Sequence, residues 1–212
     1  NSRTTDLKIA EKLSKHCKIN KTALFFTSSS AVYSPSYLPV NEDGKIDPVS
    51  TYGKVKYETE NLLIDYSDSG KFQLGIFRLF NPYGIGQSTD YVIAQIINCV
   101  LNNKPLTIKH PNSVRDFIYI DDVVECWLRA SKFNSCLNLC MNIGTGVPTK
   151  VKKLISIIKK KIPGTKYHLS KPTKGDQNFI VGYNDLLRSK LDIKKFLTVE
   201  KGLESFISSL QF

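Results

Sequence analysis

The feature that most constrains the fold is an alternation of short apolar runs with amphipathic segments of helical period. Residues 6–17 carry apolar side chains at helical spacing, and the segment 22–27 then contains the unbroken apolar run of residues 23–26. A second pair follows, with a helical period over 51–63 and an apolar run over 72–80. Unbroken apolar runs are typical of parallel strands that are buried on both faces. Alternation at this spacing predicts βαβ units and a parallel sheet.

Beyond residue 83 the pattern becomes mixed. It predicts helices over 91–101, 122–130 and 149–161 and short strands near 106–109, 117–120 and 139–143. We expect the strand at 139–143 to rejoin the sheet formed by residues 1–83, and residues 84–212 to form mainly a smaller mixed α/β lobe.

Composition narrows the classes of function. Lys and Arg number 30 against 19 Asp and Glu, which gives a net charge of +11, and such an excess suggests contact with phosphates, nucleic acid or an acidic membrane. The lysines are scattered over nearly every segment, and no aromatic residues interleave the basic stripe of residues 149–161, so neither a nucleic-acid nor a membrane partner is expected. The five cysteines form no CxxC pair, and no apolar run approaches the roughly 18 residues of a membrane span. We expect a soluble, cytoplasmic protein.

Tyr52 and Lys56 stand four residues apart near the start of the helix predicted from residue 51. This spacing puts both side chains on one helix face, a turn apart. A nearby ammonium favours the phenolate and lowers the pKa of a tyrosine, whose ordinary value is about 10. The pair predicts a proton acceptor for a sugar hydroxyl, although the pattern alone also fits a surface tyrosine beside a solvated lysine.

Hydroxyl side chains end the strand that precedes this helix. Ser28 to Ser30 follow the apolar run directly. The carboxyl ends of parallel strands border the crevice in which such sheets bind ligands, so we expect these hydroxyls to face the same site as the tyrosine and lysine. The alternative is that the serines serve only as hydrogen-bonding groups of the strand end.

The order of five motifs resembles the extended short-chain dehydrogenase/reductases, and more narrowly the UDP-glucose 4-epimerase-like nucleotide-sugar epimerases, dehydratases and reductases. The motifs are the serines that precede Tyr33, Tyr-Gly-Lys-Val-Lys at 52–56, Asn-Pro-Tyr-Gly at 81–84, the acidic segment 115–122 and Asn-Ile-Gly-Thr-Gly at 142–146. The resemblance implies an α/β fold in which a partial Rossmann-type doubly wound parallel sheet carries a smaller substrate-binding lobe.

The resemblance also implies roles around NAD or NADP. Tyr52 would be the acid/base, and Lys56 would bind the nicotinamide ribose and tune the tyrosine. Ser29, four residues before Tyr33, would hydrogen-bond the reacting sugar oxygen, and Ser28 would contact the cofactor.

For the nucleotide-diphosphate sugar, the resemblance assigns four further residues. Ser30 would contact the substrate, Asn81 the sugar or its diphosphate, Arg115 a phosphate and Asp176 the nucleotide ribose. Two plainer interpretations stay open: Asn81 is a turn residue, and Arg115 forms a local ion pair with Asp116.

The sequence departs from the family in two places. The glycine-rich strand-to-helix turn that seats the cofactor pyrophosphate is not found in these 212 residues. We therefore expect the C-terminal part of a longer enzyme, which by itself binds nicotinamide cofactor weakly and is inactive. Thr173 stands where the family often carries an arginine for the diphosphate, and Lys171 or Lys174 would have to compensate.

The leading interpretation is an NAD(P)-dependent nucleotide-sugar epimerase or reductase that dimerises, by resemblance, through the helices of residues 6–17 and 51–66. A dehydratase is not expected, because Ser30 and Ala31 follow Ser29, where the family's dehydratases carry acidic residues. The alternative is a non-catalytic scaffold of the same fold that binds a nucleotide or a partner protein.

Overall fold

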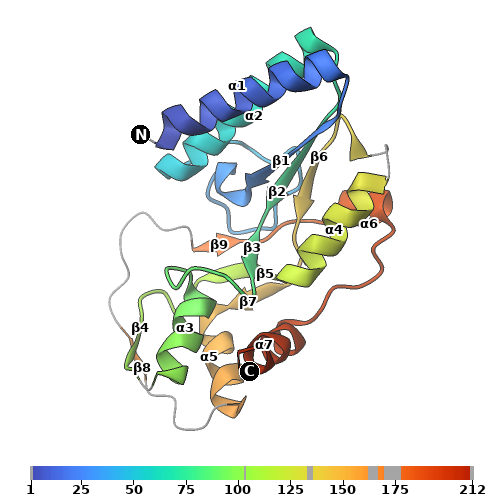
Figure 1. Cartoon of the computed structure of the whole chain (residues 1–212). Helices are drawn as coiled ribbons and strands as arrows, with labels where there is room; N and C mark the ends of the chain where they lie inside the picture. The colour runs from blue at the N-terminus through green and yellow to red at the C-terminus, as the bar shows by residue number, and fades with distance from the viewer. Residues whose placement is uncertain (1, 103, 133–135, 162–166, 170–177, 211–212) are drawn as a thin grey trace.

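The structure is a computed structural model that describes residues 2–102, 104–132, 136–161, 167–169 and 178–210. Its elements (Figure 1) are α1 (Ser2–Asn20), β1 (Leu24–Ser29), a 3₁₀ turn η1 (Ser30–Val32), α2 (Thr51–Gly70), β2 (Leu74–Leu79), β3 (Asn81–Tyr83), α3 (Val92–Leu101), β4 (Leu106–Ile108), β5 (Val114–Tyr119), α4 (Ile120–Lys132), β6 (Cys140–Ile143), β7 (Pro148–Lys150), α5 (Val151–Lys161), β8 (Tyr167–Leu169), β9 (Phe179–Ile180), α6 (Asp185–Leu191) and α7 (Val199–Ser208).

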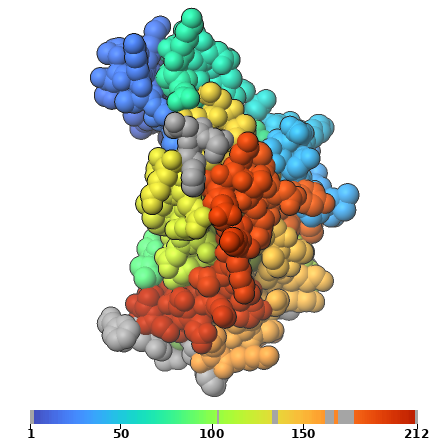
Figure 2. Space-filling view, turned by 90° about the vertical axis from the view of Figure 1, so that its right-hand side faces the viewer, coloured from blue at the N-terminus to red at the C-terminus, as the bar shows by residue number. Residues whose placement is uncertain are grey.

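A parallel sheet of order β1-β2-β6 forms the upper half of the molecule. Helices α1 and α2 cover one face of this sheet, while α4 and α6 cover the other (Figure 1) and lie side by side on the face seen in Figure 2. The predicted α/β fold class with helices on both faces is thus confirmed.

Strand β2 shows why the sequence forms a doubly covered sheet. Leu74 and Ile76 pack into the cluster under α1 and α2, whereas Phe77 packs into the cluster under α4 and α6. Since side chains alternate across a strand, a strand with helices on both faces needs apolar residues in succession. This accounts for the succession of apolar residues in β2, which Arg78 alone interrupts with a charge.

The lower half contains the sheet β3-β5-β7, with β9 also paired to β5, and the short pair β4-β8. Its core is formed by α3, α5 and α7, which meet through side chains such as Ile96, Leu154 and Phe206. Only Phe80 separates β2 from β3. One stretch of chain therefore crosses from the upper sheet to the lower one, and Asn81 lies at the crossing.

Several elements differ from their predicted bounds. The strand expected at 117–120 spans 114–119, so polar Arg115 and Asp116 lie within it. The helix expected from residue 149 begins at Val151, because residues 148–150 pair antiparallel with β5. The short strands β3, β7, β8 and β9 and helix α6 were not predicted. Strands of two or three residues are too short for a hydrophobic period to register.

The basic stripe of α5 lies against acidic residues of α7. Lys153 pairs with Glu200 at 2.9 Å, and Lys161 pairs with Glu204 at 2.8 Å. Part of the stripe thus joins two helices of the same lobe. Within the described residues, no helix combines the length and apolarity that crossing a bilayer requires.

Candidate active site

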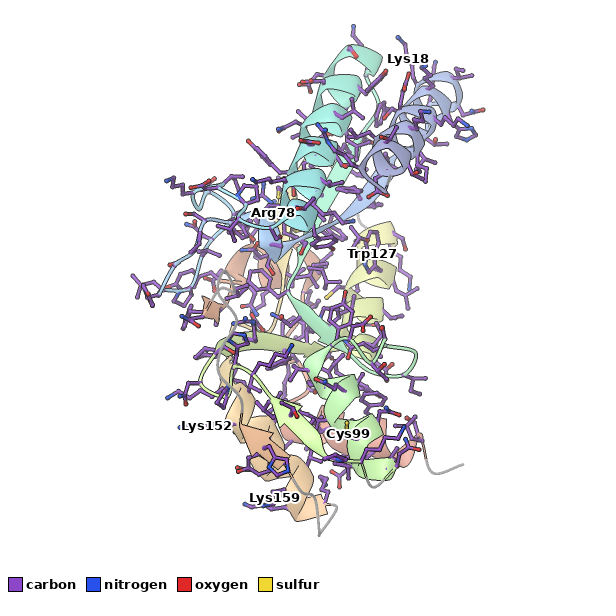
Figure 3. The ribbon with its side chains drawn as sticks, turned by 90° about the vertical axis from the view of Figure 1, so that its left-hand side faces the viewer. Lys18, Arg78, Cys99, Trp127, Lys152 and Lys159 are labelled. Carbon is purple, nitrogen blue, oxygen red and sulfur yellow. The ribbon has the colours of Figure 1, made fainter. Side chains whose placement is uncertain are left out.

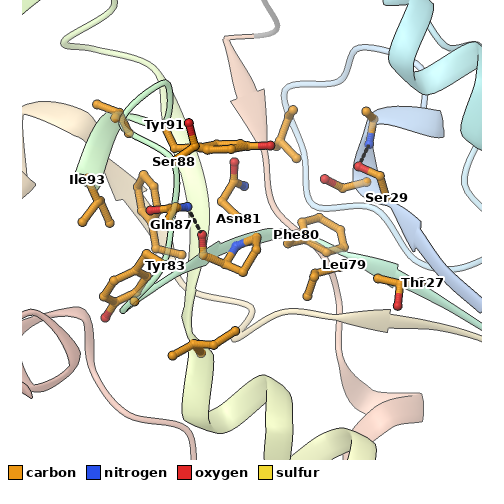
Figure 4. A pocket seen from close by; sticks show the side chains of 18 of the residues that line it. Thr27, Ser29, Leu79, Phe80, Asn81, Tyr83, Gln87, Ser88, Tyr91 and Ile93 are labelled. Carbon is orange, nitrogen blue, oxygen red and sulfur yellow. Dashed lines mark hydrogen bonds between the residues drawn. The ribbon is translucent and has the colours of Figure 1, made fainter. Parts of the chain in front are cut away.

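A cavity of about 470 Å³ opens where the carboxyl ends of β1 and β2 meet the lower lobe (Figure 4). Three chain segments and several single side chains form its wall. The lining consists of residues 27–31, 79–88 and 91–93 together with Tyr52, Lys56, Phe117, Ile120 and Ile180. The site therefore lies at the carboxyl edge of the parallel sheet, where the sequence pattern predicted it.

The start of α2 is placed by its cap and by a close backbone contact. The Ser50 hydroxyl accepts a hydrogen bond from the Gly53 amide at 3.0 Å, as an N-cap residue does. At Gly53, an added Cβ would lie 2.2 Å from the carbonyl oxygen of Ala31. The glycine thus lets the first turn of the helix touch the η1 turn, and this contact sets Tyr52 beside Ser29.

Tyr52 and Ser29 face each other across this contact. Tyr52 is 57% exposed, and its phenol is close enough to the Ser29 hydroxyl for that group to influence its pKa. Ser29 Oγ also accepts a hydrogen bond from the Ala31 amide at 3.2 Å. Partial burial of the phenol raises the pKa of Tyr52, and the nearby Ser29 hydroxyl opposes this rise without cancelling it.

Lys56 lies one helical turn behind the tyrosine. Its Nζ donates to the Thr27 carbonyl oxygen at 2.9 Å and lies 4.9 Å from the centroid of the Phe26 ring and 5.8 Å from that of Tyr52. Burial lowers the pKa of the ammonium. Burial dominates at the phenol and keeps the pKa of Tyr52 above its ordinary value, so the tuning of this pKa by Lys56 stays a prediction.

The other strand-end residues also line the cavity. Ser28 is 2% exposed, and its Oγ has no hydrogen-bond partner among the described residues. Ser30 is buried as well. Asn81 donates from Nδ2 to the Asp116 carbonyl oxygen at 3.3 Å, so its amide is held by β5 at the rim between the two sheets. A buried, unpartnered hydroxyl carries a cost in free energy that a bound ligand can offset.

Arg115 and Asp176 are not brought into this wall. Arg115 is absent from the cavity lining, although it stands opposite Ile180, a lining residue, in the pairing of β5 with β9. Its Nη1 donates to the Val114 carbonyl oxygen at 3.0 Å. Asp176 and Thr173, with the lysines on either side of Thr173, lie outside the described residues. The phosphate and ribose contacts stay predictions.

Asp116 was considered only as an ion-pair partner for Arg115. In the structure it connects β5 to two other segments of the lower lobe through hydrogen bonds. It is fully buried, and its carboxylate accepts hydrogen bonds from Thr145 N at 2.8 Å, Thr145 Oγ at 2.6 Å, Gly146 N at 3.0 Å and Gly182 N at 3.4 Å. Burial raises its pKa, and these hydrogen bonds oppose the rise. The carboxylate joins β5 to the turn after β6.

Sequence reasoning missed Gln87 and Tyr91. Gln87 donates from Nε2 to the Pro82 carbonyl oxygen at 2.6 Å, and its Oε1 is buried without a partner among the described residues. Tyr91 caps α3 and is 61% exposed along the cavity (Figure 4). The available signal was their position in the loop that follows a parallel strand, since such loops border the same crevice.

Comparison with known proteins identifies the family. The model of the NAD dependent epimerase/dehydratase family matches residues 3–144. The chain belongs to this family. A putative UDP-glucose 4-epimerase of Methanocaldococcus jannaschii is 36% identical over 179 residues, which are 81% of this chain and 54% of that protein. The dTDP-4-dehydro-6-deoxyglucose reductase of Escherichia coli is 27% identical over 206 residues, covering 89% of this chain and 61% of the relative.

Solved structures agree with the fold. The chain matches the UDP-glucuronic acid 4-epimerase of Bacillus cereus, solved with UDP-glucuronic acid and NAD, with a TM-score of 0.89 and 26% identity over 97% of this chain and 68% of that one. This match confirms the Rossmann-type α/β architecture. The chain spans a little over half the length of the two curated relatives above.

Proposed function

We propose that the protein containing this chain is an NAD(P)-dependent nucleotide-sugar epimerase or reductase. The observation that carries the proposal is the convergence of Ser29, Tyr52 and Lys56 on one cavity at the carboxyl edge of the sheet. Membership of the epimerase/dehydratase family supports it, as do relatives named for reactions of nucleotide sugars.

The residues of the cavity fit a nicotinamide cofactor. The unpartnered Ser28 hydroxyl and the Lys56 ammonium both lie at the end of β1 and can bind ribose hydroxyls or a carboxamide there. When bound, the cofactor supplies the site that accepts and returns hydride.

In this proposal, residues 1–83 with the strand at 140–143 belong to the cofactor-binding domain, and residues 84–212 mainly to the nucleotide-sugar lobe.

Tyr52 takes the proton from a sugar hydroxyl or returns it. Its raised pKa keeps the phenol protonated in the structure described, which suits the acid role; the base role requires the phenolate to be stabilised. The Ser29 hydroxyl lies close to this phenol and can orient the reacting sugar oxygen. The Lys56 ammonium is the nearby cation that stabilises the phenolate once it leaves the Thr27 carbonyl.

The proposal favours epimerase or reductase over dehydratase. Elimination of water from a 4-keto sugar needs a second acid/base pair, and Ser30 and Ala31 provide no carboxylate beside Ser29. We expect an epimer from a nucleotide hexose, or a reduced product from a keto-sugar and reduced cofactor. Proton NMR of the products checks this, and a new C6 methyl doublet from a 6-hydroxy hexose would contradict it.

The decisive test is Tyr52→Phe in the protein expressed from its complete reading frame. We expect turnover of nucleotide sugar to fall by about 10²-fold or more with little change in binding affinity, because the phenol transfers a proton rather than anchoring the substrate. Tyr57→Phe is the matched control, since it makes the same change on the same helix outside the cavity lining. Normal turnover in Tyr52→Phe would refute the catalytic role.

A wild-type protein that binds nucleotide but turns over no nucleotide sugar would favour the scaffold alternative.

The proposal also includes a homodimer formed through α1 and α2. Those helices expose apolar side chains, Ile9 and Leu13 among them, and a hollow between the helices is lined by Leu7 and Leu62 among others. Apolar surface of this kind is typical of contact with a second protein.

A further inference from the structure

A buried ion pair joins β2 to the helix that carries the candidate catalytic residues. Arg78 on β2 donates to Glu60 on α2 through two nitrogens, Nη2 to Oε2 at 2.8 Å and Nε to Oε1 at 3.1 Å. The side chains are 9% and 1% exposed. Figure 3 shows Arg78 between the strand and α2. Both carboxylate oxygens of Glu60 are therefore occupied by one guanidinium, in the bidentate geometry that is strongest for this pair.

The arginine is held in place from its other side. Its Nη1 donates to the Tyr33 hydroxyl and to the Glu42 carbonyl oxygen, each at 3.1 Å, and its guanidinium lies 4.9 Å from the centroid of the Tyr33 ring. The Tyr33 hydroxyl in turn donates to Asn142 Oδ1 at 2.7 Å. These contacts fix the guanidinium toward Glu60, so the pairing does not depend on a flexible side chain.

Helical spacing sets up a competition for Glu60. Tyr52, Lys56 and Glu60 follow one another at intervals of four residues and share a helix face. A lysine and a glutamate at this interval form an ordinary helix ion pair when both are free. The Glu60 carboxylate acts on Lys56 electrostatically even while it is bound to Arg78: its charge, with that of Asp6, raises the Lys56 pKa against the effect of burial.

We propose that Arg78 is a positioning residue which, by occupying both oxygens of Glu60, keeps this carboxylate from pairing with Lys56 and so reserves the lysine for the cavity. The observed contacts of the Lys56 ammonium agree with this, because it points to the Thr27 carbonyl oxygen and the Phe26 ring. The inference rests on the proposed function for its effect on turnover. The competition of Arg78 and Lys56 for the Glu60 carboxylate does not depend on that function and can be tested without it.

The competition differs from a purely structural brace in what a second substitution does. Arg78→Met leaves Glu60 free, and the carboxylate then captures Lys56. Adding Glu60→Gln removes the competing charge without restoring the ion pair. Turnover is compared per folded molecule, because Arg78→Met alone also leaves the buried Glu60 charge unpaired and so lowers stability more than the double variant does. On that scale a brace predicts equal losses in the single and double variants, whereas competition predicts that the double variant recovers.

The experiment compares wild type, Arg78→Met, Glu60→Gln and the double variant, each in the protein from its complete reading frame. We expect Arg78→Met to lower kcat by about 10-fold with KM for nucleotide sugar nearly unchanged, and the double variant to regain most of that loss. Glu60→Gln leaves Arg78 one acceptor and no counter-charge, so we expect it to be less stable than wild type but to keep kcat near wild type per folded molecule. Equal losses in the single and double variants, or no loss in the single one, would overturn the proposal.

A second readout requires no turnover. Acetic anhydride labels free amines, and peptide mass spectrometry measures the rate at Lys56. We expect Arg78→Met to slow labelling by about 3-fold or more, because a paired ammonium is less often deprotonated, and the double variant to restore it. Unchanged labelling refutes the competition. A wild type without turnover but with this labelling pattern refutes the proposed function alone. If Arg78→Met does not fold, Arg78→Lys takes its place, since one ammonium cannot hold both oxygens of Glu60 in the bidentate manner.

Discussion

Replacing Gly53 with alanine tests whether the contact between α2 and the η1 turn sets the catalytic geometry. The added Cβ would lie 2.2 Å from the Ala31 carbonyl oxygen and 3.1 Å from Cβ of Pro48. Real Cβ contacts almost never fall under 3.0 Å, so helix and turn must separate by the difference, 3.0 − 2.2 = 0.8 Å. The clashing atom belongs to the backbone, and no side-chain rotation relieves it.

Two opposing effects decide the change in stability. Alanine favours a helix over glycine by about 1 kcal/mol. Forcing a methyl group into a closely packed contact costs about 1–3 kcal/mol, and this contact is at the severe end because only backbone can move. We expect the free energy of unfolding to fall by about 1–2 kcal/mol. A displacement of close to 1 Å between Tyr52 and Ser29 lowers turnover by about 10²-fold.

Urea denaturation measures the first effect, and turnover of a nucleotide hexose measures the second. Gly70→Ala at the other end of the same helix is the matched control, since its Cβ meets only side-chain atoms, the nearest being Phe72 Cδ1 at 3.2 Å. We expect the control to keep wild-type turnover. A Gly53→Ala protein as stable and as active as wild type would show that the helix and turn adjust without cost, and the positioning argument would fail.

Two further outcomes are expected. Asp116→Ala leaves the Thr145, Gly146 and Gly182 donors without their acceptor. The free energy of unfolding, measured by urea denaturation, should therefore fall by about 3 kcal/mol. A change under about 0.5 kcal/mol would contradict the importance of this carboxylate. If α1 and α2 form the dimer contact, Leu7→Glu should give a monomer in sedimentation equilibrium while Ile19→Glu, at the far end of α1, keeps the dimer. A wild-type monomer at micromolar concentration would refute the dimer.

The sequence predicted the upper sheet well, because β2 is buried on both faces and the helices beside it on one, although β1 at the sheet edge is only partly buried. Runs such as residues 72–80 leave a hydrophobic signal that local periodicity detects, and Ser50 marked the start of α2 through its cap. The same argument placed Ser28 to Ser30 at the cavity, because a residue at the end of a parallel strand must face the crevice.

The lower lobe was predicted less well, for a physical reason. Strand β5 begins with polar residues whose burial is compensated by contacts far along the chain, such as those that the Asp116 carboxylate accepts from the turn at 145–146. The hydropathy of a residue does not indicate which distant groups will form hydrogen bonds with it. Gln87 and Tyr91 were missed because their loop carries no periodic pattern, and only the position of the loop after β3 brings them to the cavity.

The Tyr52–Lys56 pair shows where spacing stops being informative. An interval of four residues predicts that two side chains share a helix face, and the structure has both of them at the cavity. The same interval separates Lys56 from Glu60, and by spacing alone the lysine should bind the carboxylate. The difference lies in Arg78, 18 residues beyond Glu60 on a neighbouring strand, which holds that carboxylate in a dry environment. In the proposed function, the chemistry of the Tyr52–Lys56 pair therefore depends on a buried ion pair between α2 and β2, which spacing along the helix cannot reveal.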